Sequence, residues 1–210
     1  TSLAAANTAK QTGLLYGAVM SEMQQRNFAA ARQHLARLQS MNGLELSATR
    51  LVRLLSAELA LSAGDAPQAV ALLEPKVTVI ANHDRATRMQ LAQSRVATRK
   101  PAQAKLAAGE LSLWLNLHPR DASAWLLQAS AYELLGDGLR SIRAQAEARA
   151  MELDYGAAVD RFKAAQILAH QMASEGKLDR AGHMEASIID ARLRELERLR
   201  REQALERSIN

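Results

Sequence analysis

The sequence predicts an all-α fold, an α-solenoid of stacked helix pairs closed by a long C-terminal helix. Its 210 residues include 42 Ala and 32 Leu, so about a third of the chain consists of strong helix formers. Segments rich in Val, Ile and Thr are nearly absent, and short turn motifs recur at intervals close to the length of a helix pair. This combination excludes a β-sandwich and a parallel α/β sheet.

Charge and cysteine content limit the classes of function. The chain has 27 basic and 22 acidic side chains, a net charge of +5, and no cysteine. It therefore has neither a disulfide framework nor a thiol nucleophile. Its longest apolar stretches, such as residues 54–64, are much shorter than the ~20 apolar residues of a membrane-spanning helix. We expect no transmembrane segment.

Ten helices follow from the turn signals and from the spacing of apolar side chains. They are predicted at residues 10–25, 28–41, 45–63, 66–80, 84–98, 101–117, 121–135, 138–152, 155–173 and 179–205. The helix pairs are 10–41, 45–80, 84–117 and 121–152, and the last two helices are left over. No linker rich in Ser, Gly or Pro interrupts them, which predicts a single repeat domain over residues 1–210.

The turns inside the first three pairs share a motif in which a small residue follows the turn and precedes a leucine-rich stretch. The motif reads RNFAAA at 26–31, GDAPQA at 64–69 and RKPAQA at 99–104. The small residues Ala31, Ala69 and Ala104 are 38 and 35 residues apart, close to the ~34 residues of a two-helix repeat.

The segment HPRDASAWLLQASAYELLGD at 118–137 adds the most specific signal. Trp125, Ala129 and Tyr132 lie on one stripe of a helix, where the small Ala129 lets a partner helix approach and Gly136 accommodates the turn that follows. This segment resembles the tetratricopeptide repeat (TPR). The resemblance implies a right-handed solenoid, in which Trp125 and Tyr132 pack between helices and do not form a ligand pocket.

The repeat changes phase after the fourth pair. Ala158, Phe162 and Ala165 fit the second helix of a unit whose first helix is 138–152, so that helix would end one unit and begin the next. The last helix carries a broad apolar face, formed by Ala181, Met184, Ile188, Ile189, Leu193, Leu196 and Leu199. We expect this helix to cap the open end of the solenoid.

Three segments of the C-terminal half resemble the TPR region of one group of proteins. They are LGDGLRSIRAQAEARA at 135–150, DYGAAVDRFKAAQ at 154–166 and EASIIDARLRELE at 185–197. They resemble the C-terminal region of periplasmic HExxH zinc metallopeptidases that carry TPR arrays, the group of the β-barrel assembly-enhancing protease. The resemblance implies a periplasmic or exported protein with a zinc peptidase domain ahead of this chain. It also implies contacts with outer-membrane proteins or their assembly machinery.

The chain itself has no HExxH motif, in which two His one helical turn apart bind zinc and the Glu acts as general base. Its histidines are not in zinc-ligand spacing; they are His34, His83, His118, His170 and His183. The sequence also lacks a Ser/His/Asp order, a Gly-rich phosphate loop and clustered carboxylates at turns. We therefore predict no catalytic residue, no metal ligand and no cofactor within this chain.

In a TPR the first helix of each pair lines a concave groove, and the resemblance assigns groove positions to this chain. They are Tyr16, Met20, Met23, Leu54, Glu58, Met89, Gln93, Ser130 and Glu133. A groove rich in Met and Leu suits extended polypeptides, because Met side chains repack around different partners. The same side chains fit the core between helices equally well, and both interpretations stay open.

A group of basic side chains accounts for all of the excess positive charge, with Asp84 as the single acid among them. It comprises Arg85, Arg88, Arg95, Arg99, Lys100 and Lys105. The four arginines are spaced 3, 7 and 4 residues apart, which predicts a stripe on one helix face. We favour a solvated face over a site for an anionic partner, and the lack of interleaved aromatic residues argues against nucleic acid.

The sequence therefore predicts a non-catalytic scaffold that binds polypeptide partners, as the C-terminal TPR arm of a zinc metallopeptidase and chaperone in outer-membrane protein quality control. One alternative is a free-standing TPR adaptor in secretion or envelope assembly. Another is a module whose basic stripe binds anionic lipid or nucleic acid, with binding that weakens steeply with salt.

Overall fold

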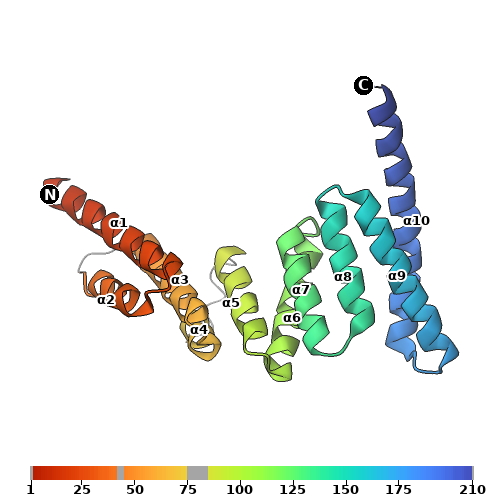
Figure 1. Cartoon of the computed structure of the whole chain (residues 1–210), viewed down its shortest axis with the longest axis horizontal. Coiled ribbons are helices and arrows are strands. Elements are labelled where there is room, and N and C mark those ends of the chain that lie inside the picture. Colours follow the sequence, from red (N-terminus) through yellow and green to blue (C-terminus); the bar gives the residue numbers. More distant parts are fainter. Residues whose placement is uncertain (1, 42–44, 75–84, 210) are drawn as a thin grey trace. The chain divides into compact units, whose positions relative to one another are not determined.

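The computed structural model describes residues 2–41, 45–74 and 85–209, with side chains described over 8–41, 45–74 and 85–206 (Figure 1). These residues form ten α-helices and no strand, which confirms the predicted all-α fold. The helices are α1 (Ser2–Gln24), α2 (Phe28–Gln39), α3 (Leu46–Ser62), α4 (Ala66–Leu73), α5 (Arg85–Ala97), α6 (Pro101–Leu117), α7 (Ala122–Leu134), α8 (Gly138–Met151), α9 (Tyr155–Ser174) and α10 (Arg180–Ile209). None of these described helices combines the length and the apolar character needed to cross a membrane.

Most helix boundaries lie within two residues of the predicted ones. The exceptions are the start of α1 and the end of α10, which extend further than predicted, and the end of α4, which comes earlier. Residues 75–80 and Asp84, which the sequence placed in helices, lie outside the described residues.

The chain divides into two compact units, Thr1–Thr98 and Arg99–Asn210. Unit 1 contains α1 to α5 and unit 2 contains α6 to α10. The sequence predicted one repeat domain, and the boundary lies inside the predicted helix pair 84–117. Each unit has its own apolar core, which includes Val19 and Leu38 in unit 1 and Phe162 and Ile189 in unit 2.

One turn geometry recurs between successive helices. A residue with positive φ ends one helix, and the very next residue is the N-cap of the following helix. This sequence of two residues occurs at Arg26 and Asn27, Gly64 and Asp65, Arg99 and Lys100, Gly136 and Asp137, and Leu153 and Asp154. The turn between α8 and α9 is therefore of the same kind as the turns inside the predicted pairs.

The turn between α7 and α8 shows how both helix ends are satisfied. Gly136 has φ of 72°, and its N–H donates to the carbonyl of Glu133 at 3.0 Å. The N–H of Asp137 donates to the carbonyl of Tyr132 at 2.9 Å, which completes a Schellman motif. Asp137 Oδ1 then accepts a hydrogen bond from the N–H of Arg140 at 3.1 Å, as an N-cap does. With no linker residue to spare, the two helices must run antiparallel.

The fourth residue after each of these N-caps is small and buried. These residues are Ala31, Ala69, Ala104, Ser141 and Ala158, and each is at most 4% exposed. The first three were predicted from the repeated motif, and their burial confirms them. Ser141 donates a hydrogen bond from Oγ to the carbonyl of Ala129 on α7 at 3.0 Å. A small side chain at this position therefore lets the two antiparallel helices approach closely.

Consecutive helices pack against one another in both units. In unit 1, α3 also contacts both α1 and α5. In unit 2, α8 packs between α7 and α9 and also contacts α10. Ala158, Phe162 and Ala165 of α9 are completely buried, which confirms the predicted packing of α9 on α8.

The packing of α10 differs in part from the predicted apolar face. Ile189 and Leu196 are buried as predicted, whereas Met184 is 64% and Ile188 41% exposed. The charged side chains of Glu185 and Arg192 replace them in the contact with α8.

The recurrent turn predicts that an added Cβ at Gly136 is destabilising. An L-residue other than Asn is disfavoured at positive φ, whereas the achiral Gly is not, so Gly136→Ala should lower the free energy of unfolding by about 1 kcal/mol. Gly109→Ala is the control, because Gly109 lies inside α6 with no neighbouring atom within 4 Å of an added Cβ. It should raise stability by up to about 1 kcal/mol. Urea unfolding of both variants measures this, and a shared sign would contradict the turn assignment.

The buried small residue after each turn gives a second prediction. Ala158→Leu should destabilise the protein by about 1–3 kcal/mol, because the larger side chain overfills the contact between α8 and α9. Ala164→Leu, on the exposed side of the same helix, should change stability by less than about 0.5 kcal/mol. Thermal unfolding compares the two variants, and equal melting temperatures would show that close approach at this position is unimportant.

Candidate functional site

Unit 2 contains a groove of about 690 Å³ between α6 and α10, with α7 and α8 between them. Apolar atoms are contributed by Leu115 of α6, Trp125 of α7, Met151 of α8 and Ile188 of α10. The polar side chains that share the lining are held in place by the contacts described below. We call this feature the α6–α10 groove.

The turn between α6 and α7 is fixed by two tryptophans. Trp114 donates from Nε1 to Oδ2 of Asp121, the N-cap of α7, at 2.9 Å. Trp125 donates from Nε1 to the carbonyl of Pro119 at 2.9 Å. Arg120 lies between these two anchored residues and is exposed at the edge of the groove. The bonds therefore fix the backbone from which the Arg120 side chain extends at the edge of the groove.

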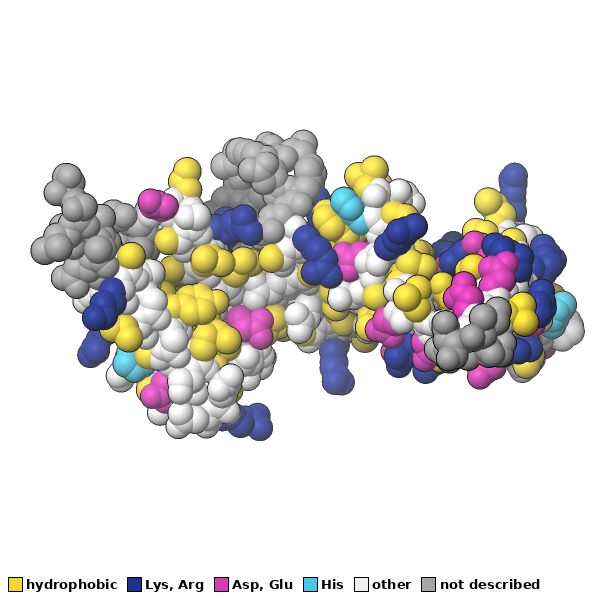
Figure 2. Space-filling view, turned by 90° about the horizontal axis from the view of Figure 1, so that it is seen from above, with side chains coloured by type: hydrophobic (Ala, Val, Ile, Leu, Met, Phe, Trp, Pro, Cys, Tyr) yellow, Lys and Arg dark blue, Asp and Glu magenta, His cyan; other side chains and the backbone are white. Residues whose placement is uncertain are grey.

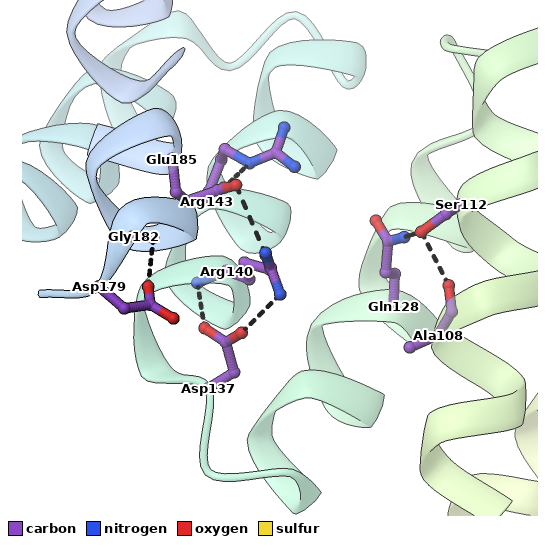
Figure 3. A network of polar contacts seen from close by, with 9 residues as sticks. All are labelled: Ala108, Ser112, Gln128, Asp137, Arg140, Arg143, Asp179, Gly182 and Glu185. Carbon is purple, nitrogen blue, oxygen red and sulfur yellow. Dashed lines mark hydrogen bonds and ion pairs between the residues drawn. The ribbon is translucent and has the colours of Figure 1, made fainter. Parts of the chain in front are cut away.

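Gln128 lines the groove from α7 and is only 3% exposed. Its Nε2 donates to Oγ of Ser112 on α6 at 2.8 Å, and that hydroxyl donates to the carbonyl of Ala108 at 2.9 Å (Figure 3). The Oε1 atom of Gln128 is buried and accepts no hydrogen bond from the described residues. Such an atom costs about 1–3 kcal/mol unless water or a ligand supplies a donor.

Arg143 of α8 is held in the groove by its neighbours. Its Nε forms an ion pair with Glu185 of α10, whose other carboxylate oxygen lies 3.6 Å from Nε of Arg140 (Figure 3). The guanidinium carbon of Arg143 lies 5.6 Å from the centre of the Trp125 ring, within the range of a cation–π contact. The Arg143 side chain is 17% exposed, so its charge is largely shielded from bulk water.

A second ion pair joins α10 to α8. Arg192 donates from Nε and Nη2 to the two carboxylate oxygens of Glu147 at 2.8 and 2.6 Å, a bidentate arrangement. The hydrogen bonds to Glu147 raise the pKa of Arg192, burial opposes this rise, and Glu195 reinforces it. The guanidinium therefore remains charged at every pH at which proteins fold. The Glu147 side chain is 6% and the Arg192 side chain 26% exposed, so α10 is fixed to α8 by a charge pair whose carboxylate is buried.

The α6–α10 groove can contact a ligand with apolar, donor and acceptor groups at once. Trp125 and Ile188 offer apolar surface, Arg120 and Arg143 offer donors, and the exposed amide of Asn116 offers an acceptor. Among the residues that the structure describes, no three His, Asp or Glu side chains gather closely enough to hold a metal ion.

A smaller depression of about 210 Å³ lies on another face of α7 and α8. It is lined by Leu126, Ser130, Glu133, Gln145, Arg149 and Arg161. Two of the predicted groove positions, Ser130 and Glu133, are therefore brought together here and do not line the larger groove.

Most of the predicted groove positions of unit 1 contact its core. Tyr16 and Met23 pack against the cluster around Leu38, Leu54 packs against another cluster, and Met89 is only 9% exposed.

The other three predicted positions of unit 1 are polar or exposed. Glu58 accepts a hydrogen bond from Nε2 of Gln90 at 3.0 Å, Gln93 is exposed, and Met20 is 36% exposed. Exposed apolar side chains of unit 1 include Leu14, Leu46 and Leu51. Figure 2 shows apolar side chains over the helices of unit 1 on the face that it draws.

The prediction of a solvated arginine stripe on α5 is wrong for Arg95. This side chain is 5% exposed, and its Nη2 lies 3.2 Å from Oε1 of Glu74, the residue that ends α4. Arg88, two helical turns earlier on the same face, is partly buried, while Arg85 is exposed. The stripe fails because of tertiary packing. This face of α5 packs toward α4, where the Glu74 carboxylate neutralises the charge of Arg95.

The remaining members of the basic group belong to unit 2. Arg99 follows the end of α5 and has φ of 54°, and Lys100 is the N-cap of α6. Both are exposed, as is Lys105. The six basic residues therefore do not form one stripe on one helix.

Sequence reasoning missed the residues that build the α6–α10 groove. It placed the groove at the TPR consensus positions on the first helix of each pair, which in unit 2 are Ser130 and Glu133 of α7, and it assigned Trp125 to packing between helices. A signal was present only in α8, where Arg143 and Glu147 are charges four residues apart on an Ala-rich helix. Glu185 and Arg192 do not stand out in the sequence, because α10 is rich in charged residues throughout. Charged residues on the buried face of a helix need partners, and here the partners surround a groove.

Comparison with known proteins gives no relationship. No protein-family model matches the chain, and no curated protein matches it.

The Arg192 and Glu147 pair yields a stability prediction. Arg192→Met leaves the buried Glu147 carboxylate without its partner, so it should lower the free energy of unfolding by about 3 kcal/mol. The double variant with Glu147→Leu should recover most of that loss. Arg194→Met, at an exposed position on α10, should change it by less than about 0.5 kcal/mol. Chemical denaturation of the three variants measures their free energies of unfolding. An Arg192→Met protein as stable as the wild type would contradict the role of the Arg192 and Glu147 ion pair in joining α10 to α8.

Proposed function

We propose that the chain is a TPR-like helical-repeat module that binds polypeptide partners. The observation that carries the proposal is the α6–α10 groove, in which apolar surface alternates with side chains that can bond to a peptide backbone. An extended peptide presents its own N–H and C=O groups beside its side chains, so it needs both kinds of contact. The exposed amide of Asn116 can bond to the peptide backbone, and Trp125 and Ile188 offer apolar surface to its side chains.

The repeated turn supports the repeat assignment. The left-handed residue, the N-cap and the buried small residue recur at every predicted turn inside a helix pair and again between α8 and α9. The contacts of α3 with α1 and α5 are those expected when the first helices of successive pairs stack. The contact of α8 with α10 fits a repeat whose phase changes at α8.

We propose, from the resemblance, that this module is the C-terminal arm of a periplasmic zinc metallopeptidase that acts on outer-membrane proteins. The zinc and the catalytic residues would then belong to a domain that precedes Thr1. Reading the coding sequence upstream of Thr1 tests this directly. An HExxH motif behind a signal segment is the expected result, and an open reading frame without that motif would favour a free-standing adaptor.

Peptide binding itself is tested with an array of extended peptides of varied composition. The wild-type chain should bind a subset of them. Asn116→Trp fills the groove from the exposed end of α6 and should weaken binding at least about tenfold, which corresponds to ~1.4 kcal/mol. Ile167→Trp, at a 68% exposed position on α9 outside the groove, should bind as the wild type does. Failure of the wild type to bind any peptide, or undiminished binding by Asn116→Trp, would contradict the proposal.

A further inference from the structure

Three polar groups of the α6–α10 groove have unused hydrogen-bonding capacity. Arg143 uses Nε for Glu185, and within the described residues its Nη1 and Nη2 make no hydrogen bond; both atoms extend away from that carboxylate in Figure 3. Arg120 is exposed at the rim and makes no ion pair with the described residues. The buried Oε1 of Gln128 also has no described donor.

The carboxylates around the groove are already engaged. Glu147 is held by two hydrogen bonds from Arg192, and Glu185 is shared between Arg140 and Arg143. Three arginines and one glutamate line the groove itself. A negatively charged ligand would therefore meet an excess of positive charge and no unpaired carboxylate among these residues.

The two available cations lie on different elements, next to apolar surface. Arg143 is on α8 and largely buried, whereas Arg120 is in the turn between α6 and α7. Ile188 of α10 is 41% exposed and lines the same groove as Trp125. Such an arrangement matches a ligand with separate negative charges and an apolar group, and it fits a single terminal carboxylate less well.

We propose that the α6–α10 groove binds an extended acidic segment of a partner protein, with Asp or Glu side chains on Arg143 and Arg120 and an apolar side chain against Trp125 and Ile188. This inference rests on the proposed polypeptide-binding function and specifies its ligand.

Pre-organisation makes Arg143 an effective anchor. Glu185 and the Trp125 ring already fix its guanidinium, so binding immobilises little additional side-chain freedom. A hydrogen bond from a shielded guanidinium to a carboxylate is also stronger than one between neutral groups. A nucleic acid fits the groove less well, because Trp125 is the one aromatic side chain in its lining and successive bases would find no second stacking platform.

The test uses fluorescence anisotropy of the full chain with labelled short peptides that are acetylated and amidated, so that their termini are uncharged. One peptide has several Asp and Glu around a central Leu. Its matched partners replace the acids by Gln and Asn, or by Lys. A single-stranded oligonucleotide serves as the competing anion.

The acidic peptide should bind at least about tenfold more tightly than the neutral one, and rising salt should weaken its binding. Arg120→Glu reverses an exposed charge that no fold contact uses, and it should weaken this binding by about tenfold. Arg194→Glu is the control with the same change of net charge on an exposed part of α10, and it should leave binding within about twofold of the wild type. Ile188→Ala should reduce the affinity for both acidic and neutral peptides.

Each other outcome is decisive. Equal affinities for the acidic and neutral peptides would overturn the acidic preference and leave the proposed polypeptide-binding function standing. Equal losses for Arg120→Glu and Arg194→Glu would show a general charge effect and overturn the assigned site. Tighter binding of the oligonucleotide, sensitive to Arg120→Glu, would replace the peptide by a nucleic acid. Failure of every peptide to bind would overturn both the inference and the function on which it rests.

Discussion

The architecture depends on one local constraint, the way in which the chain reverses between helices. A residue with positive φ ends one helix, and the next residue is already the N-cap of the following helix. Because the N-cap of one helix is also the residue that closes the Schellman motif of the helix before it, the connection leaves no linker. Within each unit, the two helices joined by such a turn then run antiparallel and pack against each other. The contact is close enough only if the fourth residue after the N-cap is small, and Ala158 and Ser141 show this in unit 2. Local hydrogen bonds thus dictate the packing of helix pairs.

The association of α10 with α8 follows a different principle. Part of the contact is apolar, around Ile189, but Glu185 and Arg192 provide buried ion pairs where further apolar side chains would be expected. Buried ion pairs stabilise less than well-packed apolar side chains of similar volume, so their presence is weak evidence for a purely structural role. Here Arg192 lines the groove and Glu185 holds Arg143 in position. We infer that the charged contact between α8 and α10 has two roles. It joins the two helices, and it holds the Arg143 guanidinium where a ligand can accept its hydrogen bonds.

Local features of the fold were predictable from the sequence, and tertiary features were not. The motifs around Ala31, Ala69 and Ala104 predicted the turns because the information lies within six consecutive residues. The arginine stripe failed at Arg95, since nothing in α5 reveals that Glu74 ends the neighbouring helix beside it. The larger groove was missed for the same reason. It is built from four helices, and the spacing of residues within any one of them does not show which side chains meet.

Nuclear magnetic resonance of the two indole N–H groups tests the central claim most directly. Trp125 lines the groove and donates to Pro119, whereas Trp114 is 8% exposed and donates to Asp121. The Trp125→Phe variant assigns the two signals. Titration of the full chain with an acidic extended peptide should shift the Trp125 indole signal in a saturable manner and move the Trp114 signal much less. Saturable binding of the peptide with an unchanged Trp125 signal would place its site elsewhere and contradict the assignment of function to the α6–α10 groove.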